Sequence, residues 1–197
     1  MKRFIAPGLL LCAALLLAGC DQSGPAPQFK LADVTGANFG KEIALTGHDG
    51  KPRTLADFRG KVVVIFFGFV HCPDVCPTVL AELAMVAKEL GKDADRMQVL
   101  FVTVDPERDT PEVLRQYVPS FNPAFLGLYG DSEATARAAK EFKIFYQKQP
   151  LKTGDYSVDH SAVTYILDQQ GRLRLFAQYG QGAPALLHDI RILLGTP

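Results

Sequence analysis

Continuous apolar runs along the chain predict buried strands. Residues 61–67 read Lys-Val-Val-Val-Ile-Phe-Phe, a β-branched and aromatic run typical of a strand covered on both faces of a parallel sheet. Three further runs of this kind lie at 97–104, 125–129 and 161–167. A turn at 168–171 follows the last run, and we expect 172–178 to be its antiparallel hairpin partner.

Between these runs, apolar residues recur every three or four positions, as they do on one face of an α-helix. The predicted helices cover about 78–90, a segment capped by Thr110 and opened by Pro111, 133–141 after a Ser132 cap, and 184–194 before Gly195. Residues 29–45 predict short edge strands, 48–51 a hairpin turn, and 54–58 one helical turn. This order predicts an α/β, thioredoxin-like fold with a mixed central sheet, helices on both faces and an N-terminal β extension.

The first twenty residues predict an export signal. Lys2 and Arg3 give a basic start, an apolar stretch follows at 9–18, and Leu17-Ala18-Gly19-Cys20 resembles the bacterial lipoprotein cleavage box. An ordinary secretory signal with a chance cysteine is the alternative. The predicted organisation is a lipoprotein signal peptide at 1–19, a flexible tether at 20–28 that starts with lipidated Cys20, and one domain at 29–197. We therefore expect a lipid anchor on the periplasmic face of the bacterial inner membrane.

Composition narrows the functional classes. The chain has 197 residues, and its 21 Lys and Arg balance 21 Asp and Glu, so it offers no basic surface for nucleic acid. Of its four cysteines, Cys12 would leave with the signal and Cys20 would be acylated. Cys72 and Cys76 then remain as a thiol pair in a compartment that favours disulfides.

The pair lies in Cys72-Pro-Asp-Val-Cys76-Pro77, between a predicted buried strand and a predicted helix. A helix N-terminus lowers the pKa of a nearby thiol, and a spacing of four brings two helical side chains to one face. Two thiolates are soft donors that favour Cu(I), Zn or an iron–sulfur cluster. The alternatives are a stabilising disulfide and thiol–disulfide exchange.

The four histidines offer further donors. His48 lies in a predicted turn and is expected to be solvated, His188 is expected on a helix surface, and His71 could point either way. His160 precedes the predicted strand 161–167, and in a thioredoxin-like fold this loop faces the cysteine loop.

Thiol oxidoreductases of this fold place a cis-proline in that loop, whereas no proline occurs between Leu151 and Ala183. His160 facing Cys72 and Cys76 would form a Cys₂His set that suits copper. We expect Asp159 or a backbone carbonyl to orient the imidazole ring.

Four motifs in order resemble the Sco/SenC family of copper-assembly proteins: Phe58–Lys61, Cys72–Pro77, Asp105–Pro111 and Tyr156–Ser161. The resemblance covers about 29–194. It implies a membrane-tethered protein that binds one copper, Cu(I) or Cu(II), through the two cysteines and His160. It further implies a periplasmic copper donor and a role in assembling the dinuclear copper centre of cytochrome c oxidase subunit II. A lipidated Cys20 would replace the transmembrane helix common in the family.

Other interpretations stay open. Some family members act as thiol reductants for the cysteines of that subunit, so a thiol–disulfide reductase is the main alternative to a metallochaperone, which is not an enzyme. A peroxidase is disfavoured because Phe69 stands where peroxiredoxins usually have threonine. Asp105, Arg108 and Asp109 could meet a partner or support the site, or they could simply build the loop before Thr110.

Overall fold

The computed structural model describes residues 28–152 and 154–196. The predicted signal peptide, the predicted lipidation site Cys20 and all but the last residue of the predicted tether lie outside the described residues. Within the described part, no helix has both the length and the hydrophobicity needed to cross a membrane.

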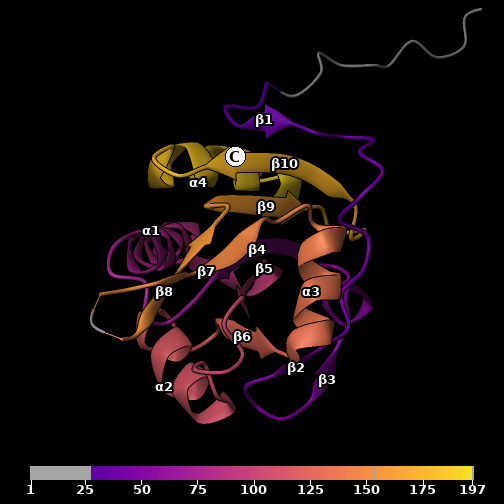
Figure 1. Ribbon diagram of the computed structural model, residues 1–197. Helices are drawn as coiled ribbons and strands as arrows, with labels where there is room; N and C mark the ends of the chain where they lie inside the picture. The colour runs from indigo at the N-terminus through magenta and orange to yellow at the C-terminus, as the bar shows by residue number, and fades with distance from the viewer. Residues whose placement is uncertain (1–27, 153, 197) are drawn as a thin grey trace, which may run out of the picture.

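Eight strands of the described residues form one mixed sheet in the order β1-β10-β9-β4-β5-β6-β2-β3 (Figure 1). They are β1 (Ala32–Asp33), β2 (Leu45–Gly47), β3 (Pro52–Arg53), β4 (Val62–Gly68), β5 (Met97–Thr103), β6 (Leu126–Tyr129), β9 (Val163–Leu167) and β10 (Leu173–Gln178). β4, β5 and β6 are parallel, β9 pairs antiparallel with β4, and β10 pairs antiparallel with β9. Two further strands, β7 (Tyr146–Pro150) and β8 (Tyr156–His160), pair only with each other in a separate hairpin of the described chain.

Helices cover both faces of the main sheet, as predicted. They are α1 (Val75–Leu90), α2 (Pro111–Phe121), α3 (Ser132–Glu141) and α4 (Gly182–Leu194), with 3₁₀ turns at Leu55–Phe58 and Gly91–Arg96. Apolar residues of α1, α2 and α4 share one core cluster, whereas α3 and the first 3₁₀ turn contribute to the other. Figure 1 shows α1 and α2 to the left of the sheet and α3 to its right.

The central strand β4 explains this two-sided core. All seven of its residues are buried. Because successive side chains of a strand point to opposite faces, Val64 and Phe66 join the cluster under α1, and Ile65 and Phe67 join the cluster under α3. The continuous apolar run seen in the sequence is therefore a strand buried on both faces, which confirms the prediction.

The structure differs from the predicted elements in three places. α1 begins at Val75 rather than near Thr78, so Cys76 lies inside its first turn. Asp131, not Ser132, caps α3, because its side chain accepts a hydrogen bond from Ala134 N. The hairpin of β7 and β8 was not predicted, and β9 begins at Val163 instead of Ser161.

One buried carboxylate joins the two ends of the described chain. Asp189 of α4 is fully buried and accepts hydrogen bonds from the backbone N–H groups of Lys30 and Leu31, the latter at 2.7 Å. The next segment, β1, pairs with β10 at the edge of the sheet. The start of the domain is thus fastened to its last strand and its last helix.

Candidate metal centre

Cys72 and Cys76 meet where β4 ends and α1 begins. Cys72 is half-buried in the connecting loop, and Cys76 is fully buried in the first helical turn. The backbone N–H of Cys76 donates to Cys72 Sγ at 3.4 Å, and both thiols are free. The spacing of four thus brings the two sulfurs together through a helix N-terminus, as the sequence predicted.

The two thiols have opposite acid–base character. A hydrogen bond from the Cys76 thiol lowers the pKa of Cys72 from its ordinary value of 9.0 to about 5, helped by the backbone N–H groups of Cys76 and Asp74 and by His160, while burial opposes the shift. The same hydrogen bond, together with burial, raises the pKa of Cys76. At neutral pH the pair therefore consists of an accessible Cys72 thiolate and a buried Cys76 thiol.

Gly68, the last residue of β4, makes room for the buried sulfur. A Cβ atom at this position would lie 2.7 Å from Cys76 Sγ and 2.9 Å from the ring of Phe101. Neither neighbour can retreat easily, since both are fully buried. The absence of a side chain at Gly68 is therefore a packing requirement of the site.

His160 approaches the sulfurs from β8. Its Nε2 lies 3.9 Å from Cys76 Sγ, and its Nδ1 lies 3.3 Å from the Val158 carbonyl oxygen. Because a carbonyl can only accept, this contact favours a proton on Nδ1 and leaves the Nε2 lone pair toward Cys76. The rings of Phe69 and Phe66 pack around the imidazole, with centroids at 5.6 Å and 6.5 Å.

The separation of donors fits a shared metal ion. An ion bonded to sulfur at about 2.3 Å and to imidazole nitrogen at about 2.0 Å holds the two atoms about 3.5–3.7 Å apart. The observed 3.9 Å between Cys76 Sγ and His160 Nε2 is close to that separation. Within the described residues no group of three His, Cys, Asp or Glu is already set in metal-holding geometry. A three-donor group that includes Cys72 therefore requires an adjustment of the site.

Asp105, Arg108 and Asp109 lie beside the site and turn inward. Asp105 and Asp109 are almost completely buried, and only 17% of the Arg108 side chain is exposed. Asp109 accepts from the Thr103 hydroxyl at 2.6 Å and from Val70 N at 3.1 Å, and burial raises its pKa. The segment thus builds the loop between β5 and α2, and it also contacts the loop that carries Cys72.

The remaining predicted residues lie apart from the sulfurs. Asp159 is exposed on β8, and the Val158 carbonyl contacts the His160 ring instead. His71 is exposed, with Nδ1 4.0 Å from Asp109, and His188 contacts Asp189 on α4. The expectation that His48 is solvated was wrong: it is buried, and its Nδ1 accepts a hydrogen bond from Gly127 N at 3.0 Å.

Tyr117 of α2 is a neighbour of the site that the sequence did not single out. Its hydroxyl is buried and has no hydrogen-bond partner among the described residues. Burial, followed by the charges of Cys76, Cys72 and Asp109, raises its pKa. Its helical spacing suggested only an apolar face, and no signal in the sequence marked its hydroxyl as part of the surroundings of the thiol pair.

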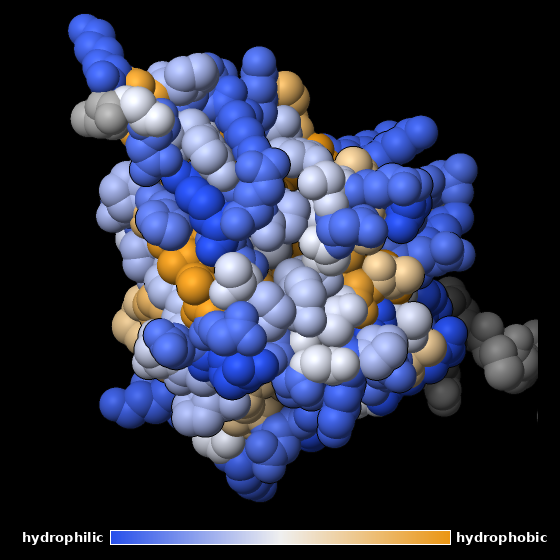
Figure 2. All heavy atoms as spheres, turned by 60° about the horizontal axis from the view of Figure 1, so that its bottom comes forward, coloured by the Kyte–Doolittle hydropathy of each residue, from blue (hydrophilic) through white to orange (hydrophobic). Residues whose placement is uncertain are grey.

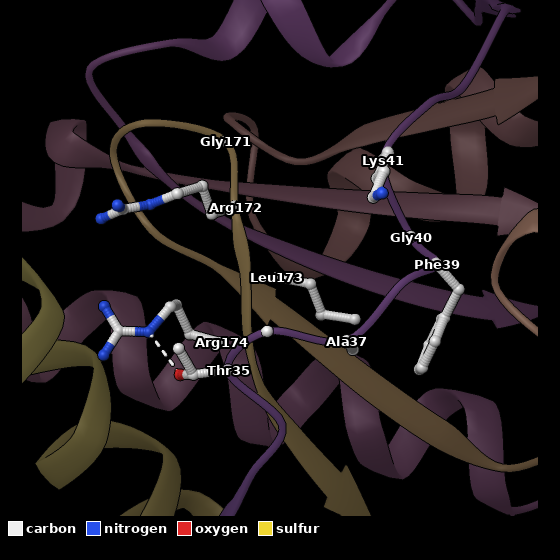
Figure 3. Close-up of a pocket in the computed structure, with 10 residues that line it drawn as sticks. Thr35, Ala37, Phe39, Gly40, Lys41, Gly171, Arg172, Leu173 and Arg174 are labelled. Atoms are coloured by element: carbon white, nitrogen blue, oxygen red, sulfur yellow. Dashed lines mark hydrogen bonds between the residues drawn. The ribbon is translucent and has the colours of Figure 1, made fainter.

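A cavity of about 650 Å³ lies at the other end of the sheet. It is lined by the segment from Thr35 to Lys41 and by the start of β10. Leu173 pairs with Leu167, which pairs with Val63 at the beginning of β4, whereas Cys72 follows the end of that strand. Figure 3 shows Leu173 directed toward Phe39, and Arg172 and Arg174 extending to the opposite side. This cavity is separate from the thiol pair.

The face of the molecule that carries α2 is mostly polar. Figure 2 shows small hydrophobic areas on this face, each bordered by hydrophilic atoms. The exposed large hydrophobic side chains of the described residues include Phe145 and Leu151, at the two ends of β7. No extended apolar surface is visible in this view.

Comparisons with known proteins point to one family. The family model SCO1/SenC matches residues 32–195. The mitochondrial SCO2 homolog of Mus musculus is 39% identical over 153 residues, which cover 76% of this chain and 60% of that protein. The chain spans only about half to three fifths of the length of the first curated relatives it matches.

Two solved structures share both fold and sequence with the chain. Bradyrhizobium japonicum ScoI, solved with copper bound, is 39% identical with a TM-score of 0.73, over 79% of this chain and 99% of that one. Apo Sco1 from Thermus thermophilus is 41% identical with a TM-score of 0.76, over 87% and 100%. These similarities confirm the predicted thioredoxin-like fold.

Proposed function

Because the chain belongs to the SCO1/SenC family, we propose that it is a copper metallochaperone for the assembly of cytochrome c oxidase, with subunit II and its dinuclear copper centre as the recipient. The observation that carries the proposal is the approach of His160 Nε2 to within 3.9 Å of Cys76 Sγ, beside the Cys72 thiolate. Copper bound to a related ScoI supports the choice of metal.

The asymmetry of the thiols gives an order of events. Cys72 is already a thiolate at neutral pH and is half-exposed, so it is the first sulfur that an incoming copper ion meets. Cys76 must lose its proton as it becomes a ligand, and metal binding supplies the driving force for that loss. His160 completes the set through Nε2, because its Nδ1 faces the Val158 carbonyl oxygen.

The proposed cellular setting rests on the predicted export signal. The cleavage box that ends in Cys20 supports a lipid anchor on the periplasmic face of the inner membrane. There the protein would take copper from a periplasmic donor and present it to the oxidase. Both thiols must be reduced before copper enters, because a disulfide has no thiolate to offer.

Copper loading of the full chain, purified in detergent and reduced, tests the proposal. We expect one copper per wild-type chain, loss of that copper in Cys72→Ala and Cys76→Ala, and weaker copper binding with a changed EPR spectrum in His160→Ala. His188→Ala is the matched control, because His188 lies on α4 and contacts Asp189 instead of the sulfurs. Unchanged copper affinity and an unchanged EPR spectrum in His160→Ala would refute the proposed ligand set.

Reduction of the cysteines of the oxidase subunit is the second candidate function. The observation in its favour is the half-exposed Cys72 thiolate beside the buried Cys76 thiol, since a thiolate of lowered pKa is the nucleophile of disulfide exchange. Cys72 would attack a substrate disulfide to form a mixed disulfide, and Cys76 would then displace the substrate as its thiol. The protein dithiol is oxidised and the substrate disulfide is reduced.

The two functions differ in their need for the imidazole. Disulfide exchange by copper-free protein should survive in His160→Ala, whereas copper retention should be weakened. A reductase assay on a disulfide peptide, run beside copper loading, separates them.

A further inference from the structure

The two halves of the proposed site stand on different elements, and this raises the question of what fixes their distance. Cys72 and Cys76 belong to the buried junction of β4 and α1. His160 ends β8, whose only strand partner among the described residues is β7. The base of the hairpin is tied to the main sheet through β9, which begins three residues after His160, and the rest of β8 is held by side chains.

Arg108 makes several of the polar contacts that hold the hairpin. Its guanidinium donates to the Tyr156 carbonyl at 2.8 Å and to the Asp155 carboxylate at 3.1 Å. The same group lies 3.7 Å from the centre of the Tyr156 ring, a cation–π contact. Tyr156 and Asp155 are four and five residues before His160, at the start of β8 and just before it.

The residues on either side of Arg108, Asp105 and Asp109, connect it to Tyr156 and to the cysteine loop. Asp105 holds Arg108 Nε and also accepts a hydrogen bond from the Tyr156 hydroxyl at 2.8 Å. Asp109, the residue after Arg108, accepts from Val70 N, two residues before Cys72. The segment from Asp105 to Asp109 therefore bridges the imidazole side and the thiol side of the site.

We propose that Arg108 is a positioning residue for His160: by fixing β8 through Tyr156 and Asp155, it sets the distance from the imidazole to the sulfurs and so controls how long copper is retained. Arg108 itself does not touch the metal in this proposal. The inference rests on the proposed copper-binding function and adds to it a control on metal release. A planar guanidinium suits the role, because its several N–H groups can donate to a carbonyl and two carboxylates while its flat face stacks on an aromatic ring.

The test measures copper loss from the full chain to a Cu(I)-specific chelator. We expect Arg108→Gln to lose copper roughly ten- to hundredfold faster than wild type, the usual range for residues that orient a metal ligand. The rate of copper loss from Arg108→Lys should lie between these two rates, because lysine keeps the positive charge but lacks the several N–H donors of the guanidinium. Arg115→Gln is the matched control: Arg115 also donates to a backbone carbonyl, that of His48 at 2.8 Å, away from β8, and its rate should stay within about twofold of wild type.

A double-mutant cycle separates positioning from general destabilisation. If Arg108 acts through His160, the chelator rate of Arg108→Gln/His160→Ala should equal that of His160→Ala alone. The copper(II) EPR spectrum of Arg108→Gln should also shift toward that of His160→Ala. If Arg108→Gln does not fold, the same comparison with and without His160→Ala can be made with Arg108→Lys and with Tyr156→Phe.

Three results would decide against the inference. A wild-type rate in Arg108→Gln, with His160→Ala still defective, would overturn the inference and leave the proposed function intact. An equal rate increase from Arg108→Gln with and without His160 would assign it a general structural role. Failure of the wild-type chain to bind copper would overturn the proposed function and the inference with it.

Discussion

The two sides of the proposed site differ in how they are built. The thiol side grows out of β4, a strand buried on both faces between neighbours in the main sheet. The imidazole side is a hairpin whose strands are mostly exposed or half-buried. It continues into β9 three residues after His160, and the rest of it is held by buried Val158 and by side-chain contacts such as those of Arg108. A site built this way has one rigid half and one half that can open at low cost, which suits an ion that must be taken up and later given away.

The largest expected difference is the acidity of the two thiols. With its pKa lowered to about 5, Cys72 should be alkylated by iodoacetamide at a rate that rises through pH 5 and is constant from about pH 7, because only the thiolate reacts. Cys76 should react at least about tenfold more slowly at pH 7, since its pKa is raised and it is buried. Mass spectrometry of the modified peptides measures both rates.

Cysteine and histidine variants sharpen this prediction. Cys76→Ala should raise the pKa of Cys72 most, because it removes the largest cause of the shift. His160→Ala should raise it less. If the alkylation rate of Cys72 in the wild type still rises between pH 8 and 9, Cys72 is not a thiolate at neutral pH and the prediction is wrong.

The next largest difference is expected in the free energy of unfolding, when one core side chain is shortened on the thiol side and one on the imidazole side. Phe66→Ala in β4 should lower the free energy of unfolding by about 3–5 kcal/mol, because it leaves a cavity under α1. Val158→Ala in β8 should cost only about 1.5 kcal/mol for two lost methyl groups. Urea unfolding followed by circular dichroism gives both values, and equal losses would remove the contrast between the two sides.

Gly68→Ala should have an intermediate effect. The new methyl group would lie 2.7 Å from Cys76 Sγ, so we expect a loss of about 1–3 kcal/mol in the free energy of unfolding and weaker copper retention. Gly50→Ala is a poor control because its φ is positive. Ala81→Gly, on the exposed side of α1, provides a comparison in which only helix propensity changes, at about 1 kcal/mol. Copper retention in Gly68→Ala equal to that in Ala81→Gly would refute the packing argument.

The smallest effect is expected from the exposed ion pair of the hairpin. Lys148 of β7 contacts Glu107 at 2.6 Å, but both side chains are largely exposed. Lys148→Ala should therefore change the free energy of unfolding by less than about 1 kcal/mol, and added salt should reduce the difference further. Copper release from Lys148→Ala as fast as that from Arg108→Gln would mean that Lys148 shares the anchoring role.

The difference between buried and exposed strands also explains how much of the fold the sequence could predict. β4 and β5 were found because a strand buried on both faces is a continuous apolar run. β7 was missed because Tyr-Gln-Lys-Gln-Pro is polar and largely exposed, so it carries no hydrophobic pattern. The start of α1 was misplaced because Pro77 was taken as the last residue before the helix, although the first turn tolerates proline.

Side-chain contacts between distant segments were also beyond the sequence. His48 was expected in solvent because it lies in a turn, yet a backbone N–H from β6 and the packing of the turn enclose it. The inward direction of Asp105 and Arg108 depends on the hairpin that was not predicted. Cys72, Cys76 and His160 could be named because motif spacing and fold topology located them without any contact being known.

The hydrogen bonds from Lys30 N and Leu31 N to buried Asp189 have a mechanical consequence. Tension applied to the chain at its amino-terminal side reaches the domain first at Lys30 and Leu31, where α4 and the β1–β10 pairing take the load. In the order of strands, β10 and β9 stand between that point and β4, which leads to the cysteine loop. A force on the amino-terminal side of the domain is therefore expected to load β1, β10 and β9 before it reaches the sulfurs.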